Sequence, residues 1–154
     1  MRIRNGKYSF VVNILCLAIL VGNIVYLIAV WGNLPEQIPR HYDSAGNITR
    51  YGGKGAVFVV PIINLIFFFV ISLFELFPKA WNTGVKVTAE NKERVYRIIR
   101  NMLVTIKFSM VFTFAFVSVS QTLDGSLPGW FMPVSLSLMF VPMIFFIVKL
   151  VRAR

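Results

Sequence analysis

Four long apolar runs, each carrying at most one charged residue, alternate with polar stretches along the chain. The runs cover residues 9–31, 56–77, 102–120 and 130–150. Each is about 20 residues long, the length at which an α-helix crosses about 30 Å of hydrocarbon. The pattern predicts an all-α membrane protein: a single domain over residues 1–154, folded as a four-transmembrane-helix bundle.

The first apolar run is compatible with a cleaved signal peptide or with a retained helix. The apolar part of a signal peptide has about 7–15 residues and ends at a small-residue cleavage site. The run 9–31 is longer, and the Trp31–Pro35 segment at its end is not such a site. We therefore expect a retained first helix that ends near Trp31.

The composition agrees with a membrane protein. Hydrophobic residues make up 57% of the chain and charged residues 14%, whereas soluble domains are about half apolar and a quarter charged. The net charge of +10 comes from basic residues that lie beside the apolar runs, unlike the separate basic surface of a nucleic-acid-binding domain. We expect these residues to face the lipid bilayer, and we expect no nucleic-acid partner.

The basic residues are divided unequally between the two sides of the predicted membrane domain. Thirteen of the sixteen fall on one side: Arg2, Arg4, Lys7, the six from Lys79 to Arg100, Lys107, Lys149, Arg152 and Arg154. The other side holds Arg40, Arg50 and Lys54. Because short basic loops stay in the cytoplasm, we expect both termini to be cytoplasmic and residues 32–55 to face outward.

Two charged residues fall inside the predicted spans. Glu75 lies near the end of the second run, and Lys107 lies at a similar depth in the third. A charge in hydrocarbon is costly and usually has a partner, so an ion pair is one interpretation. The other is that Lys107 extends to the membrane surface alone. Thr88 is a candidate N-cap for a helix that begins at Ala89 and continues into the third span.

Uncharged polar residues also occur within the spans. They include Asn13, Asn23, Asn64, Thr105, Ser109 and Thr113. Thr105, Ser109 and Thr113 recur every four residues and therefore share one face of the third helix. Small hydroxyl residues allow transmembrane helices to approach closely, and we favour this role over a pore lining. Asn13 and Asn23 are likewise expected to face a neighbouring helix more than a pathway.

The polar stretch between the first two runs has the features of an ordered loop. Prolines 35 and 39 favour extended neighbours, residues 44–47 have the composition of a turn, and glycines 52, 53 and 55 permit a tight entry into the second helix. We expect an ordered extracellular loop between helices 1 and 2, over residues 32–55. The residues expected to pack on the outer helix ends are Leu34, Ile38, Tyr42 and Tyr51.

His41 and Asp43, with Glu36 nearby, are weak candidates for metal ligands in this loop. A metal site needs three or four ligands in a fixed geometry, and the only further candidate on the outer side is Asp124. We therefore predict no metal and no cofactor. The chain also lacks a nucleophile elbow, a His-Glu-x-x-His motif and a phosphate-binding loop, so we do not expect an enzyme.

The same loop carries a longer sequence pattern that resembles the pattern of a known family. It reads Leu34-Pro35-x-x-Ile38-Pro39-x-His41-Tyr42-Asp43-x-x-Gly46 and closes with Tyr51-Gly52-Gly53-Lys54. In this pattern the chain resembles the bacterial membrane domain of unknown function found at the N-terminus of the sporulation-delaying-protein immunity factor. Tyr42-Asp43 stands in place of Phe-Asn, and Thr49-Arg50 in place of Asp-Gly. The immunity factor has further spans, so the resemblance bears on fold more directly than on the immunity role.

The resemblance implies a multi-pass protein of the bacterial cytoplasmic membrane that protects against, or senses, a toxic extracellular peptide. The peptide would bind the outer loop, at Leu34, Pro35, Ile38, Pro39, His41, Tyr42, Asp43, Gly46, Tyr51, Gly52 and Lys54. Two alternatives stay open: a small transporter or channel lined by Asn23, Asn64 and the Thr105 face, and a metal-dependent membrane enzyme at His41 and Asp43. The sequence does not predict the oligomeric state.

Overall fold

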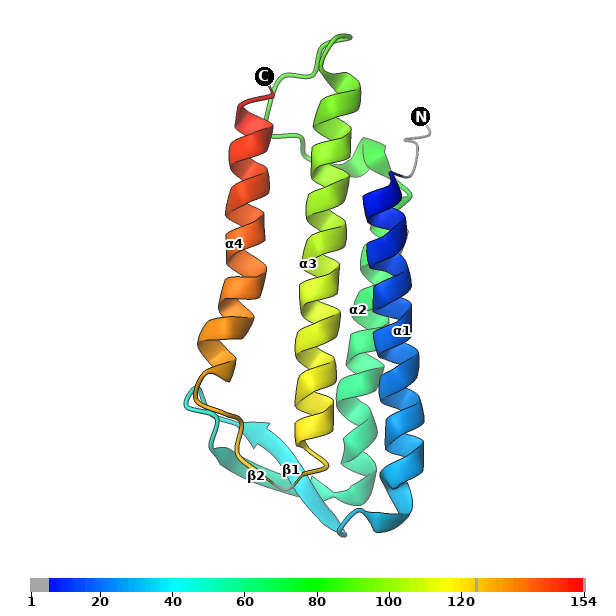
Figure 1. The fold of residues 1–154 in the computed structure, drawn as a ribbon, viewed down its shortest axis with the longest axis vertical. Coiled ribbons are helices and arrows are strands. Elements are labelled where there is room, and N and C mark those ends of the chain that lie inside the picture. Colours follow the sequence, from blue (N-terminus) through cyan, green and yellow to red (C-terminus); the bar gives the residue numbers. More distant parts are fainter. Residues whose placement is uncertain (1–5, 124, 154) are drawn as a thin grey trace.

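The computed structural model describes residues 6–123 and 125–153, and it is mostly helical. Its long helices are α1 (Lys7–Val30), α2 (Val59–Glu75), α3 (Lys92–Ser120) and α4 (Phe131–Val151), which lie side by side (Figure 1). Three short 3₁₀ helices adjoin them: η1 (Trp31–Asn33) after α1, η2 (Lys54–Phe58) before α2 and η3 (Pro78–Ala80) after α2.

Four helices in the described part of the chain are long and apolar enough to cross a membrane. With the adjoining 3₁₀ turns they cover Lys7–Asn33, Lys54–Glu75, Lys92–Ser120 and Phe131–Val151. In the most apolar window of each, at most 33% of the residues are buried inside the molecule. Apolar side chains therefore cover most of the outside of the helices, a surface far larger than a soluble monomer exposes. The expectation of four apolar helices long enough to span a membrane is confirmed, and these helices support the prediction of a membrane protein.

α3 is the helix on which the other three pack. It contacts α1, α2 and α4. Five of its buried positions, spaced three or four residues apart, share one face: Val104, Lys107, Val111, Ala115 and Ser118. Val104 and Val111 on this face pack in one apolar cluster with Val12, Cys16, Leu20 and Phe68.

The third span continues from the polar segment before it without a break, as predicted, but α3 begins at Lys92 instead of Ala89. A turn closed by two side chains precedes it. The Thr88 N–H donates to Asn91 Oδ1 (2.8 Å), and the Asn91 N–H donates to Thr88 Oγ1 (3.3 Å). This reciprocal pairing has the geometry of a capping box, so the cap predicted at Thr88 belongs to the turn that leads into the helix.

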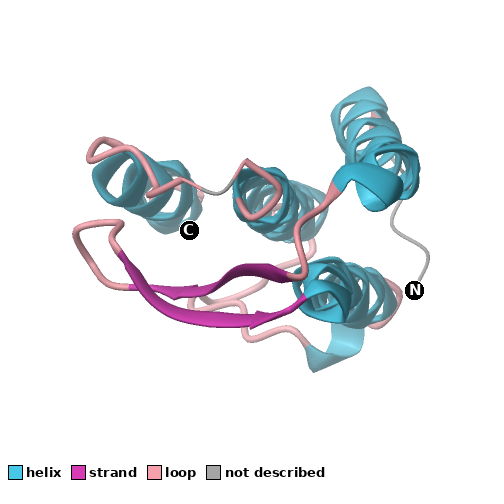
Figure 2. Cartoon of the chain, turned by 90° about the horizontal axis from the view of Figure 1, so that it is seen from below, coloured by secondary structure: helices cyan, strands magenta, loops and turns pink. Residues whose placement is uncertain are grey.

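Residues 37–53 form an antiparallel β-hairpin, so the prediction of an all-α protein is wrong in this segment. Its strands are β1 (Gln37–Tyr42) and β2 (Ile48–Gly53), and they lie across the helix ends (Figure 2). The expected extended conformation before residue 42 and the turn at residues 44–47 are confirmed. Pro39 argues against a strand because it donates no backbone hydrogen bond. The hairpin accommodates it beside a register shift between Pro39 and His41.

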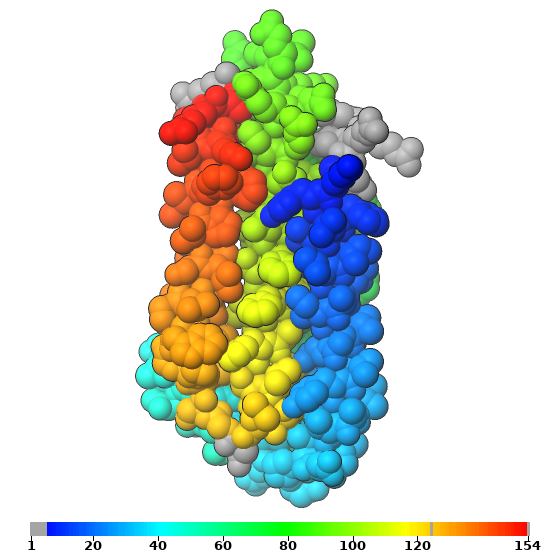
Figure 3. All heavy atoms as spheres, viewed as in Figure 1, coloured from blue at the N-terminus to red at the C-terminus, as the bar shows by residue number. Residues whose placement is uncertain are grey.

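The two ends of the molecule differ in charge. The start of α1, the end of α4 and the α2–α3 connection lie at one end, and the hairpin lies at the other (Figures 1 and 3). The described members of the large basic set therefore gather at the first end, which we call the basic end; the second is the hairpin end. Arg2, Arg4 and Arg154 lie outside the described residues.

Candidate functional site

The hairpin is held against the helices by buried apolar side chains. Leu34 and Ile38 form a core with Leu27 of α1 and Val57 of η2, and Pro39 is also fully buried. Burial of side chains of this size contributes about 1.5–3 kcal/mol each. Leu34, Ile38 and Pro39 therefore pack on the helix ends next to the hairpin, as expected for Leu34 and Ile38, and are not on the surface that meets solvent.

The turn of the hairpin is attached to the connection between α3 and α4. The Leu127 N–H donates to Gly46 O (2.8 Å). Gly46 has φ +87°, and a Cβ added there would lie 2.4 Å from Leu127 O. Only glycine allows both this backbone conformation and this close approach.

A buried glutamine makes a second hydrogen bond to the hairpin. Gln121, at the end of α3, is buried, and its Nε2 donates to Pro39 O (3.0 Å). The hairpin thus receives hydrogen bonds from two points that follow it by about 80 residues in the chain. Nothing in the local pattern around Gln121 or Leu127 indicated these contacts.

Both oxygens of Asp43 are used inside the turn. Asp43 Oδ1 accepts hydrogen bonds from the Ala45 and Asn47 N–H groups (2.9 Å each), and Oδ2 accepts one from Asn47 Nδ2 (3.1 Å). The bond from the Asn47 side chain, and then that from its backbone, lowers the pKa of Asp43 below its ordinary value of 3.8. These bonds favour the ionised carboxylate because they disappear when it is protonated.

The described residues contain no group of three or more His, Cys, Asp or Glu that lie together. His41 and Asp43 therefore have no third ligand in this part of the chain, and Asp124 lies outside the described residues. A metal-dependent site at His41 gains no support from the hairpin geometry. The absence of a bound metal and of enzyme activity remain predictions.

The predicted binding residues divide by exposure. Leu34, Ile38, Pro39 and Gly46 are buried; Tyr42, Gly52 and Lys54 are half-buried; Pro35, His41, Asp43 and Tyr51 are exposed. Tyr51 has 49% of its surface exposed, and Arg40 and Arg50 are exposed on the same two strands. His41 lies opposite Arg50 across the hairpin. The solvent-facing surface of the hairpin therefore presents one aromatic ring, one imidazole and two guanidinium groups.

Residues of the 3₁₀ helices η1 and η2 contact one another beside the hairpin. Lys54 Nζ lies 5.1 Å from the centre of the Trp31 ring, a cation–π distance. The Trp31 ring also lies 5.2 Å from the Phe58 ring. Gly52 faces the Arg40 side chain, where an added Cβ would lie 3.1 Å from Arg40 Cδ. These contacts fix the entry of the chain into α2.

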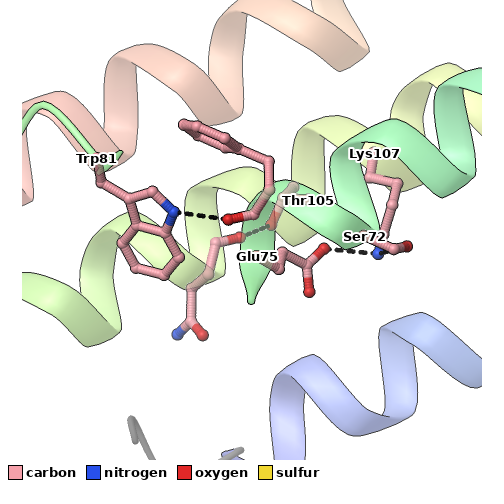
Figure 4. A network of polar contacts seen from close by, with 7 residues as sticks. Ser72, Glu75, Trp81, Thr105 and Lys107 are labelled. Carbon is pink, nitrogen blue, oxygen red and sulfur yellow. Dashed lines mark hydrogen bonds and ion pairs between the residues drawn. The ribbon is translucent and has the colours of Figure 1, made fainter. Parts of the chain in front are cut away.

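Glu75 and Lys107 form the predicted ion pair, and the interpretation of Lys107 extending alone to the membrane surface is wrong. Lys107 Nζ lies 2.5 Å from Glu75 Oε1 and donates to Ser72 Oγ (2.9 Å) (Figure 4). The two side chains are 1% and 5% exposed. Lys107 Nζ also lies 4.9 Å from the centre of the Phe68 ring. A charge buried in this way needs such a partner, so the pair joins α2 to α3.

Two members of the predicted hydroxyl face make contacts between helices. Thr105 Oγ1 shares a hydrogen bond with the Tyr8 hydroxyl of α1 (2.7 Å). Ser109 Oγ donates to Leu138 O of α4 (2.7 Å). These contacts support the packing interpretation for Thr105 and Ser109. The third member, Thr113, has a buried Oγ1 with no hydrogen-bond partner among the described residues.

The membrane asparagines differ in how well they are paired. Asn64 Nδ2 donates to Val111 O of α3 (3.1 Å), which joins α2 to α3. Asn23 Nδ2 on α1 is buried without a partner among the described residues, and so is Asn13 Oδ1. Asn64 is thus an interhelix contact, whereas Asn23 is left with an unused donor.

The basic end has its own apolar core, which the sequence did not indicate. Trp81, only 6% exposed, packs in a cluster with Val95, Ile99, Leu150 and Ala153, and its Nε1 donates to Phe74 O (3.0 Å) (Figure 4). A single Trp in a polar segment was the one available signal. This core fixes the α2–α3 connection against the end of α4.

Polar side chains close the same region. Asn91 Nδ2 donates to Lys86 O (3.0 Å) and to Ala153 O (3.2 Å), and an Arg94 guanidinium nitrogen also donates to Ala153 O (3.3 Å). The segment just before α3 is therefore tied to the end of the described chain. Residues 81–91 form an ordered connection at the basic end.

One family model matches the chain, over residues 18–65: the domain of unknown function DUF1648. The matched segment contains the second half of α1, the whole hairpin and the beginning of α2. It thus centres on the segment that carries the resemblance described above and supports a membrane domain of unknown function. The match carries no link to an immunity factor. Neither a curated protein nor a solved structure matches the chain.

Proposed function

We propose that the chain is a multi-pass protein of the bacterial cytoplasmic membrane whose hairpin lies outside the cell and binds a toxic peptide, in immunity or in sensing. The observation that carries the proposal is the hairpin itself. Its apolar side chains pack on the helix ends, and its turn is hydrogen-bonded to the α3–α4 connection. Tyr51, His41 and Arg50 are nevertheless exposed to solvent.

A fixed surface of this kind favours binding. A receptor that is already ordered loses less conformational entropy when its ligand binds. Tyrosine and arginine are the residue types that contribute most often to binding hot spots. The buried residues Leu34 and Ile38 have a supporting role in this proposal, because they hold the hairpin and leave contact with the peptide to the exposed side chains.

The proposed orientation is supported by the charge difference between the two ends. The hairpin end carries Arg40, Arg50 and Lys54 together with Glu36 and Asp43, while most of the described basic residues lie at the basic end. Regions rich in Lys and Arg remain in the cytoplasm. The four-helix bundle then has its basic end and both termini inside the cell.

The contacts within the membrane give less support to a transporter. Thr105 and Ser109 use their hydroxyl groups between helices, and the Glu75–Lys107 pair joins two helices. A pathway would need such groups to face water instead.

Cysteine labelling in intact cells tests the orientation. In a Cys16→Ala background, Ser44→Cys in the hairpin turn reacts with a membrane-impermeant maleimide, whereas Ala89→Cys at the basic end reacts only after lysis. Both native residues are exposed. The reverse labelling pattern contradicts the proposal.

Survival assays test peptide binding. Cells that produce the chain are exposed to a panel of amphipathic membrane-active peptides with negative, neutral and positive net charge. We expect protection against at least one, reduced about tenfold or more by Tyr51→Ala, as for a hot-spot residue, and reduced also by His41→Ala. Ser44→Ala, also exposed on the hairpin, is the control and keeps protection at equal protein level. Equal survival with and without the chain rejects the proposal.

A further inference from the structure

The basic end carries four exposed cations at a similar level along the helix axes. They are Lys79 in η3, Arg97 in α3, Lys149 near the end of α4 and Arg152 just after it, and we call them the cation belt. Each lies within two residues of a member of the Trp81 core, whose other members are Val95, Ile99, Leu150 and Ala153. Because this core packs the three segments together, it fixes the depth of the four cations.

The length of α3 relates this level to the bilayer. α3 has 29 residues and is therefore about 44 Å long, whereas the hydrocarbon layer is about 30 Å thick. Counted from Ser120, about 20 residues fill that layer, up to Asn101. Arg97 then lies about 6 Å beyond the hydrocarbon, within a headgroup region that is about 5–8 Å thick on each side. α3 projects past the start of α1 at this end (Figure 1).

The belt has no counter-charge among the described residues. None of its four charged groups has a carboxylate within 4 Å in this part of the chain. Glu75 is paired with Lys107. The other acidic residues at this end lie further from the hydrocarbon, because Glu93 is about 12 Å beyond Asn101 and Glu90 precedes α3. The belt therefore presents unneutralised positive charge to the headgroup region.

Exposed apolar side chains adjoin the belt on its membrane side. Phe77, two residues before Lys79, is 57% exposed, and Phe145, about one helical turn before Lys149, is 52% exposed. Lys149 Nζ lies 4.5 Å from the centre of the Phe145 ring. Positive charge bordered by apolar surface matches a molecule that has a phosphate group next to hydrocarbon chains. A soluble polyanion such as nucleic acid has no group for the apolar part.

We propose that the cation belt binds the phosphate groups of anionic phospholipids in the leaflet at the basic end. The acyl chains of these lipids lie against Phe77 and Phe145. The orientation rule for membrane proteins depends only on the number of basic residues on each side. It requires neither a common depth nor the absence of carboxylate partners, and these two features carry the inference. The inference does not require the peptide-binding proposal or an extracellular hairpin.

Quenching of Trp81 fluorescence by brominated lipids tests the proposal. The reporter is the full chain with Trp31→Phe and Trp130→Phe, which leaves Trp81 beside the belt as the single tryptophan. It is reconstituted in phosphatidylcholine vesicles that contain either brominated phosphatidylglycerol or brominated phosphatidylcholine, with the bromine near the ester end of one acyl chain. Both leaflets have the same lipids, so the orientation of the protein does not affect the result. We expect phosphatidylglycerol to bind near Trp81 about fivefold more tightly.

Charge variants of the reporter locate the effect. Arg97→Gln/Lys149→Gln should reduce the preference to about twofold or less, whereas Arg97→Lys/Lys149→Arg keeps both charges and should retain it. Lys86→Gln/Lys92→Gln is the matched control. It removes the same charge from the basic end, but Lys92 lies about 14 Å beyond Asn101, past the headgroup region. The control should therefore keep the preference.

Two results overturn the proposal. One is equal quenching by the two lipids in the reporter, and binding of soluble poly-glutamate to the belt alongside that result would assign the surface to an acidic protein. The other is an equal loss of preference in the belt variant and in the control, which would show that net charge alone attracts the lipid. Circular dichroism checks that each variant is folded, and Lys79→Gln/Arg152→Gln provides the same test if Arg97→Gln/Lys149→Gln does not fold.

Discussion

The hairpin end and the basic end both have defined contacts, but they use backbone and side-chain groups to different extents. At the hairpin end, the apolar core around Leu34 and Ile38 is supplemented by hydrogen bonds to two backbone carbonyls of the hairpin: Leu127 N–H to Gly46 O, and Gln121 Nε2 to Pro39 O. At the basic end the contacts use side chains, with Trp81 in an apolar core and Asn91 joined to the end of α4. Both ends therefore have an apolar core, but the hairpin end also depends on the backbone conformation and close approach at Gly46, and the basic end on the side-chain hydrogen bonds of Trp81 and Asn91.

This difference matters for which surface can recognise a ligand. The hairpin is fixed by a few buried apolar side chains and by hydrogen bonds to its backbone carbonyls, so Tyr51 and His41 remain exposed. At the basic end the Trp81 side chain is buried in the apolar core and is not exposed to a ligand. The comparison predicts that a substitution at either end affects only that end, through backbone conformation at the hairpin end and through side-chain contacts at the basic end. Breaking the ion pair between α2 and α3 should instead destabilise the whole molecule.

The largest effect is expected from breaking the ion pair. Glu75→Leu leaves Lys107 buried without its partner and should reduce the free energy of unfolding by about 3–5 kcal/mol. The double variant Glu75→Leu/Lys107→Met removes both charges and should recover most of this loss. Unfolding in mixed micelles on addition of sodium dodecyl sulfate measures the difference. If the double variant is as unstable as Glu75→Leu, burial of an unpaired charge is not the cause.

Gly46→Ala should be next, and its effect should be confined to the hairpin end. The left-handed conformation at φ +87° and the approach to Leu127 O together cost about 2 kcal/mol or more. Hydrogen–deuterium exchange should rise over residues 37–53 and stay unchanged over residues 81–99. Gly53→Ala is the control, since a Cβ at Gly53 meets nothing within 4 Å. Faster exchange at both ends would show that the two are coupled.

Trp81→Phe should have a smaller effect, at the basic end. The substitution keeps an aromatic ring in the core but removes the hydrogen bond from Nε1 to Phe74 O, at a cost of about 1 kcal/mol. Exchange should rise over residues 78–95, with the hairpin unaffected. Trp130→Phe, at a half-exposed ring, should change neither end. A hairpin that loosens in Trp81→Phe contradicts local action.

The smallest effect is expected from acid at the hairpin turn. Hydrogen bonds from Asn47 and Ala45 lower the pKa of Asp43, so the stabilisation from its carboxylate is complete above the unfolded value of about 3.8 and is lost as the pH falls through the folded value below it. Amide exchange at Ala45 and Asn47 should therefore deviate from its expected pH dependence only below pH 3.8. Asp43→Asn should show no such transition. A transition at neutral pH would assign the effect to another group.

Sequence patterns predicted the parts of the fold that depend on composition and local spacing. The apolar runs gave the four spans, and the similar depths of Glu75 and Lys107 gave the ion pair. Pro35, Pro39 and the residues 44–47 gave an extended segment followed by a turn. The pairing of β1 with β2 was missed because Pro39 and the two glycines of β2 argue against strands.

The contacts that join distant segments had no local signal. Gln121 and Leu127 reach residues about 80 positions earlier in the chain, and Asn91 reaches Ala153. A polar residue at a helix end looks the same in sequence whether it is solvated or buried against another segment. Burial of Leu34 and Ile38 was expected, but the same residues were also assigned to peptide contact, and only the packing of the hairpin separates these two roles.

The hydrogen bond from Leu127 to Gly46 has a consequence for biosynthesis. A nascent chain emerges from the ribosome in order, so the segment that contains Gly46 is translated long before Leu127. During that interval the residues of both strands and of the hairpin's apolar core have been made, but the Leu127 N–H that bonds to the turn has not. The hairpin thus gains this hydrogen bond only after all of α3 and the first residues of the α3–α4 connection have been made, but it does not have to wait for α4.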